Sequence, residues 1–219
     1  MSSFQPRQVW IYDLETAINE EAKRHLTTAD LGYDGRLKDP EKIEASKNEK
    51  RAEAVKRAPL SWWYGRIVSA AVYDFEKAKM MSWTGDNEEI IIKSFFRHIR
   101  DNSHDGNNLL VGKSNSTFDD GYIIGRCMAL NLGVPDFMRR NFQISDVDQM
   151  FALRAGAATT GKLSEYNFGM LGCHKVTTGA DVAQMVVDKE WDRLQKYNEE
   201  DVLMTAFLYR RYMQEFKYD

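Results

Sequence analysis

The chain lacks the features that define several classes of protein. Its 219 residues include two cysteines, Cys127 and Cys173, which is too few for a disulfide-stapled secreted scaffold and is typical of a reducing compartment. No apolar run approaches the roughly 18 residues that cross a bilayer, and the first ten residues lack the apolar core of a signal peptide. We therefore expect a cytoplasmic protein with no membrane partner.

The chain also lacks an excess of positive charge. It has 30 basic and 33 acidic side chains, a net charge of −3, so no global basic field favours a nucleic-acid partner. Its 43% hydrophobic and 12% aromatic residues are typical of a globular protein. A chain of this length buries roughly 70% of its unfolded surface. We expect one domain over residues 1–219.

The order of hydrophobic patterns predicts an α/β fold. Runs of β-forming residues predict five strands, and apolar residues at helical spacing predict three main helices. The strands are expected at 8–12, 66–75, 79–84, 109–112 and 141–145, and the helices at 87–101, 119–132 and 189–216. A hairpin followed by strand–helix–strand connections is typical of a mixed sheet flanked by helices.

A charged insertion follows the first predicted strand. Residues 19–60 are poor in large apolar side chains, and a helix is expected at 40–57, with proline at its start. The segment 36–57 carries eight Lys or Arg and five Asp or Glu, so it could be a solvated arm, follow a phosphate backbone or dock a partner protein. The adjoining Trp62, Trp63 and Tyr64 could stack on bases if exposed; packing against the sheet is the favoured interpretation.

Acidic residues recur at the ends of predicted elements. Asp13 and Glu15 end the first strand, and their i, i+2 spacing places both on one face, where a hard cation such as Mg²⁺ would offset their repulsion. Asp119 or Asp120 begins a helix, and Tyr197 and Asp201 share a helix face at i, i+4. The alternatives are two exposed acids at a strand end, a helix cap and an ordinary ion pair.

These segments together resemble a known family. Asp13-Leu14-Glu15-Thr16, Asn115-Ser116-Thr117-Phe118-Asp119 and the Tyr197-to-Asp201 pair resemble the three motifs of the DnaQ-like DEDD superfamily of 3′–5′ exonucleases. Lys196 stands where the histidine-bearing subfamily places histidine, which favours the tyrosine-bearing class. The run from Phe118 to Arg126 is similar to exonuclease domains of family B DNA polymerases. Other positions resemble stand-alone polymerase-B-like exonucleases: Leu171, Gly172, Lys175, Gly179, Val182 and Thr205.

The resemblance implies a fold and an activity. The fold would be RNase H-like, with a mixed five-stranded sheet flanked by helices and the insertion 19–60 added to it. The activity would be metal-dependent hydrolysis of DNA from a free 3′ end, with single-stranded ends favoured and nucleoside 5′-monophosphates released. The same fold is compatible with a 3′–5′ exoribonuclease or with a catalytically silent module that binds nucleic acid or a protein partner. A bacterial or phage-like source is expected.

The resemblance also implies a site. Two Mg²⁺ or Mn²⁺ ions would be held by Asp13, Glu15, Asp119 and Asp201, and Tyr197 would aim the attacking water. The terminal nucleotide would be held by Leu14, Thr16, Asn115 and Phe118. Two divalent ions would add four positive charges to a chain of net charge −3, so the acidic balance does not exclude a nucleic-acid partner.

Overall fold

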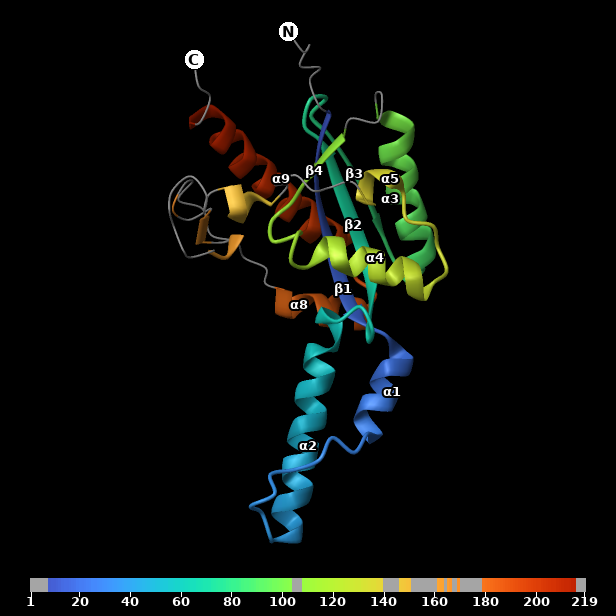
Figure 1. The fold of residues 1–219 in the computed structure, drawn as a ribbon, viewed down its shortest axis with the longest axis vertical. Helices are drawn as coiled ribbons and strands as arrows, with labels where there is room; N and C mark the ends of the chain where they lie inside the picture. Colours follow the sequence, from blue (N-terminus) through green and yellow to red (C-terminus); the bar gives the residue numbers. More distant parts are fainter. Residues whose placement is uncertain are drawn as a thin grey trace. The chain divides into compact units, whose positions relative to one another are not determined.

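The computed structural model divides the chain into two compact units. Unit 1 comprises residues 1–15 and 67–219, and unit 2 comprises Thr16–Arg66 (Figure 1). The residues that the structure describes are 8–103, 108–139, 146–150, 161–163, 165–166, 169 and 179–215. Within these ranges, no helix combines the length and the apolarity that crossing a membrane requires.

A mixed sheet forms the centre of unit 1. Its order is β3 (Lys79–Thr84), β2 (Gly65–Asp74), β1 (Gln8–Ile18) and β4 (Asn108–Val111). The β2–β3 pair is the predicted antiparallel hairpin, whereas β1 and β4 are parallel. The first strand runs six residues beyond its predicted end at Tyr12, because the pairing of the sheet continues past the apolar run.

The sheet has four strands in the described part of the chain, not the five that were predicted. The fifth was expected at residues 141–145, which lie outside the described residues. At the next position, Asp146 forms an isolated parallel bridge with Gly112, and the Val147 N–H donates to the Gly112 carbonyl at 2.9 Å. The chain therefore returns beside the end of β4, which brings residues 146–150 next to the segment that follows that strand.

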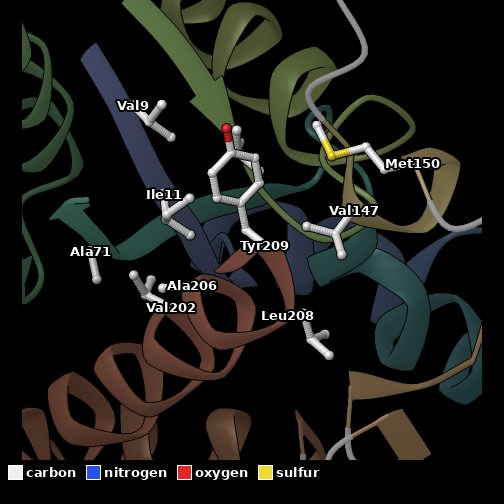
Figure 2. Packing of buried hydrophobic residues seen from close by; sticks show 10 residues of the cluster. Val9, Ile11, Ala71, Val147, Met150, Val202, Ala206, Leu208 and Tyr209 are labelled. Atoms are coloured by element: carbon white, nitrogen blue, oxygen red, sulfur yellow. The ribbon is translucent and has the colours of Figure 1, made fainter. Parts of the chain in front are cut away.

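Helices pack on both faces of the sheet because side chains alternate along β1. Val9 and Ile11 face one side and belong to a buried cluster with α9 (Trp191–Glu215) (Figure 2). The cluster is completed by Ala71, Val111, Val147, Met150, Val202, Ala206, Leu208 and Tyr209. On the other side, the ring of Tyr12 lies 5.5 Å from that of Phe95 in α3 (Glu88–Asn102). The predicted apolar stripe of α3 is buried as expected.

Three further helices belong to unit 1 in the part of the chain that the structure describes. The chain passes from β4 into α4 (Asp119–Ala129), which is followed by α5 (Asp136–Arg139), and α8 (Gly179–Val187) precedes and contacts α9. Helix α4 begins where the sequence predicted and ends three residues earlier, at a turn in which Asn131 has a φ of 53°. This helix carries Asp119 at its first position.

Unit 2 is a helical hairpin built largely from charged residues. Helix α2 (Pro40–Arg57) matches its predicted bounds, and the Asp39 side chain caps it by accepting from the Glu41 N–H. Helix α1 (Glu20–Thr28) was missed in the sequence, although Asn19 followed by two glutamates is a helix-start pattern. Leu26 is the buried residue of α1, whereas α2 has none. The 3₁₀ turn η1 (Ala58–Leu60) follows α2.

A buried ion pair ties α3 to α4. The Arg126 guanidinium donates to both carboxylate oxygens of Glu88, at 2.8 and 2.7 Å, and each side chain is 8% exposed. Glu88 also accepts from the Ile67 N–H of β2 at 2.7 Å. One carboxylate thus connects two helices and a strand, and its charge is compensated within the protein.

We expect Glu88→Gln to lower the free energy of unfolding by about 3 kcal/mol or more, because it removes the negative charge that faces a buried guanidinium. The matched control is Glu89→Gln, at the next residue, which removes one partner of an exposed pair with Lys93 and should cost less than about 0.5 kcal/mol. Urea unfolding of both variants measures the difference. Equal losses of unfolding free energy in the two variants would show that the buried ion pair contributes no more to stability than the exposed one.

Candidate functional site

Two carboxylates of β1 point to the face that α9 covers. Asp13 and Glu15 continue the odd-numbered positions of the strand, after Val9 and Ile11, so they lie on the side of the buried cluster. Asp201 of α9 meets them there. The carboxylate oxygens of Asp13, Glu15 and Asp201 all lie within 4.8 Å of one another. The structure therefore brings together three of the four predicted metal ligands.

Helix α9 presents Asp201 to the strand because its apolar stripe is packed on the sheet. Val202 and Tyr209 belong to the buried cluster, and Asp201 and Tyr197 lie on the same side at intervals of four residues. Tyr197 is 7% exposed and Asp201 is 8% exposed. The acid of α9 thus lies next to β1 at the start of the part of the helix that packs in the buried cluster.

Tyr197 is held in its protonated form. Burial and the carboxylates of Glu15, Asp201 and Asp13 raise the pKa of Tyr197 far above its ordinary value, and a hydrogen bond to Asp201 adds to the shift. A phenol in this environment donates a hydrogen bond and does not lose its proton near neutral pH. Without a metal ion, Tyr197 is therefore a hydrogen-bond donor.

The donor set of this cluster fits a hard divalent cation. Three carboxylates at such short separations repel one another unless protons or a cation lie among them. Carboxylate oxygens are the ligands that Mg²⁺ and Mn²⁺ prefer, and the set contains no sulfur or imidazole that would favour a softer metal. These three residues could hold a metal ion.

A tight turn leads from β4 to the fourth predicted ligand. Gly112 ends the strand, and a Cβ atom there would lie 2.7 Å from the Asn115 side chain and 2.9 Å from the Tyr12 carbonyl. Only glycine leaves room for the Asn115 amide, which is fully buried. Asn115 also accepts the Asp120 N–H through its carbonyl at 2.9 Å, which fixes the turn to the start of α4.

Asp119 lies beside β1, outside the three-residue cluster. Its carboxylate is 4% exposed and accepts a hydrogen bond from the Leu14 N–H, between the two acids of the strand. Burial, and then the neighbouring Asp120, raise the pKa of Asp119 to about 8. Asp120 differs from it, because its carboxylate accepts the hydroxyl of Tyr12.

A second acidic pair supports this turn and was missed in the sequence. Asp146 is 1% exposed and accepts from the Ser114 N–H at 3.2 Å, the Asp148 N–H at 2.9 Å and the Ser116 hydroxyl at 2.8 Å. Asp148 accepts from Lys113 Nζ at 3.0 Å and from the Ser114 hydroxyl at 2.8 Å. The available signal was an i, i+2 acid pair directly after a predicted strand, the same spacing as in Asp13 and Glu15.

The four predicted nucleotide-binding residues have different surroundings. Leu14 and Asn115 are buried, and Phe118 is half-buried with its ring 5.2 Å from that of Tyr122. Thr16 belongs to unit 2, where its hydroxyl donates to the Pro59 carbonyl at 2.8 Å. Their contact with a nucleotide stays a prediction.

The comparisons with known proteins extend the description of the fold. No protein-family model and no curated protein matches the chain in sequence. Among solved structures, the chain is similar to a family B DNA polymerase from the hyperthermophilic archaeon Pyrobaculum calidifontis, with a TM-score of 0.59 and 14% identity. The chain shares its fold with part of that polymerase. The match covers 94% of this chain and 24% of the polymerase.

We expect Asp119→Asn to stabilise the metal-free protein increasingly as pH rises from about 4 to 8. The folded protein holds a proton on Asp119 that the unfolded chain releases near pH 4, so the wild type loses stability as pH rises through this window. Asparagine cannot ionise, so the variant avoids this loss, and its gain should exceed about 1 kcal/mol at pH 8.

Urea unfolding in EDTA across that pH range measures this effect. Asp101→Asn is the control, because the carboxylate of Asp101 is exposed. A wild type and an Asp119→Asn variant with parallel stability profiles would contradict the burial of an ionisable carboxylate at this position.

Proposed function

We propose that the protein is a metal-dependent 3′–5′ exonuclease of the tyrosine-bearing DEDD class, with an RNase H-like fold, that hydrolyses DNA from single-stranded 3′ ends. One observation carries the proposal: acids from β1 and α9, 186 residues apart in sequence, place their oxygens within 4.8 Å of one another. The fold shared with part of a DNA polymerase supports a nucleic-acid substrate. The ordered motifs support the exonuclease class.

The proposed metal site uses residues of three elements. Asp13, Glu15 and Asp201 would hold one ion, and Asp119, beside the backbone of Leu14, would complete the site for a second ion together with Asp13. Two Mg²⁺ or Mn²⁺ ions supply, when bound, a hydroxide near neutral pH and stabilisation of the leaving 3′ oxygen. The raised pKa of Asp119 means that this carboxyl must release its proton before it can act as a ligand.

The protein's own contribution is alignment. Tyr197, protonated and buried, would donate its hydroxyl hydrogen bond to orient the attacking water, in the place where it now hydrogen-bonds to Asp201. Asn115 and its turn would hold α4 so that Asp119 stays beside β1. Asp146 and Asp148 would act indirectly. Their hydrogen bonds hold the turn that precedes α4, and they would not contact the substrate.

We expect Asp13→Ala and Asp201→Ala to reduce Mg²⁺-dependent hydrolysis by about 10³-fold or more, since a lost ligand removes several kcal/mol of transition-state stabilisation. The matched control is Glu200→Gln, an exposed acid adjacent to Asp201, which should keep wild-type activity. The assay follows 3′- and 5′-labelled single-stranded DNA, duplex DNA and RNA, with an EDTA control.

Several outcomes of this assay decide the proposal. Loss of label from the 3′ end of DNA, with shortening ladders, supports it. Cleavage of circular DNA would indicate an endonuclease, and preference for RNA would indicate an exoribonuclease. Full activity in purified Asp13→Ala would overturn the assignment of the site. Metal-dependent thermal stabilisation that is absent in Asp13→Ala, without hydrolysis of any substrate, would indicate a silent binding module.

We expect Tyr197→Phe to lower kcat by about ten- to a hundredfold, because one hydrogen bond to a charged group is lost while the ring remains packed. The shape of the pH–rate profile should not change between pH 6 and 9, since even an unperturbed phenol, with a pKa near 10, stays protonated through most of this range. Rates measured across this range check both points. A basic limb present in the wild type and lost in Tyr197→Phe would show that the phenol acts as the base.

A further inference from the structure

Unit 2 carries exposed aromatic side chains in a turn of defined geometry. Residues 60–64, which we name the aromatic loop, join η1 to β2. Trp62 and Trp63 stack with ring centroids 3.5 Å apart and planes at 27°. Trp63 nevertheless remains 69% exposed and Tyr64 41% exposed. The sequence favoured buried packing for these residues, and for Trp63 and Tyr64 that prediction is wrong.

The aromatic loop is held by hydrogen bonds within unit 2. Ser61 accepts through its carbonyl from the N–H groups of Tyr64, at 3.1 Å, and Gly65, at 2.7 Å, and its own N–H donates to Ala58 at 3.1 Å. The Asn19 N–H donates to the Tyr64 carbonyl at 2.9 Å. Because the backbone is hydrogen-bonded on both sides of the tryptophans, the exposed ring of Trp63 is held in place by an ordered turn.

The charge around the aromatic loop is positive. Lys56 and Arg57 precede it and Arg66 follows it, and no acidic residue occurs from 56 to 66. Lys56 and Arg57 are both exposed, and Arg57 forms an exposed ion pair with Glu53 at 2.6 Å. Residues 16–66 carry 11 Lys or Arg and nine Asp or Glu, whereas the rest of the chain carries 19 and 24. The basic excess of this acidic protein is therefore confined to the unit that exposes the stacked indoles.

We propose that the aromatic loop binds single-stranded nucleic acid, with a base stacked on Trp63 and the adjoining phosphates near Lys56 and Arg57. An exposed planar ring with basic residues close to it in sequence fits a base and its phosphate, and stacking tolerates any base sequence. If the ligand were a protein with an apolar surface, the side chain of Leu60, which is 67% exposed, would contribute as much to binding as that of Trp63. The inference rests on the proposed function only in the class of ligand, because binding at this surface needs no metal.

Intrinsic fluorescence gives a direct test in the full chain. Trp63 is the one exposed tryptophan of the five, all of which the structure describes; Trp10 is buried and the others are half-buried. The probe is a 12-nucleotide single-stranded DNA, titrated in EDTA so that no hydrolysis occurs. We expect quenching on binding, and Trp63→Ala should weaken binding about tenfold or more, measured by anisotropy of labelled DNA.

The controls separate stacking from other modes of binding. Trp63→Phe should retain most of the affinity, because phenylalanine also stacks. Leu60→Ala, which removes a similarly exposed apolar side chain without a ring, should leave the affinity within about twofold. A 12-unit abasic strand has phosphates but no bases, so it should bind as weakly to the wild type as DNA binds to Trp63→Ala.

Three outcomes would overturn the proposal. They are unchanged affinity in Trp63→Ala, equal affinity for the abasic strand and the DNA, or equal weakening by Trp63→Ala and Leu60→Ala. The last would indicate a general apolar surface that suits a protein partner. The binding measurements do not require hydrolysis. If DNA quenches the fluorescence of Trp63 but the protein hydrolyses no substrate in the activity assay, the aromatic loop is a binding site and the exonuclease proposal is refuted. If the protein hydrolyses DNA but Trp63→Ala binds DNA as tightly as the wild type, the exonuclease proposal stands and the proposal for the aromatic loop is refuted.

Discussion

The two-residue period of β1 is the constraint on which the rest of unit 1 depends. Its odd positions bury Val9 and Ile11 against α9, and the same face then continues into Asp13 and Glu15. Its even positions pack Tyr12 against α3. A shift of one residue in register would move the apolar pair and the two acids from the α9 face to the α3 face of the sheet. The hydrophobic core and the acidic cluster are therefore specified by one pairing register.

The acidic cluster is held against electrostatic repulsion by the packing around it. Tyr209 and Val202 pack α9 on the sheet, and the oxygens of Asp201 lie within 4.8 Å of those of Asp13 and Glu15. A similar conflict exists at α4, where burial raises the pKa of Asp119 beside Asp120. A divalent ion held by Asp13, Glu15 and Asp201 would offset the repulsion within the cluster, so the cluster is expected to be less stable without one. The Asp146 network keeps the turn before Asp119 in place.

Unit 2 differs from unit 1 because its helices bury almost no apolar side chains. Helix α2 buries no residue, and its N-terminal end is stabilised by the Asp39 cap and by the proline at its first position. Its surface is free to carry charge, and its exposed aromatics lie in a hydrogen-bonded turn outside any core. The physical consequence is a charged surface that exposes aromatic side chains.

Local patterns were enough to predict much of the fold. The period of 3.6 located α3, the proline and the helix-forming residues located α2, and the paired runs located the β2–β3 hairpin. Spacing placed Asp13 and Glu15 on one face of a strand, and the family resemblance suggested them as ligands. Each of these depends on neighbours in sequence. The meeting of these acids with Asp201, the support of Asp119's turn by Asp146, and the exposure of Trp63 were decided by tertiary structure. They depend on which distant segments pack together, and no local period carries that information.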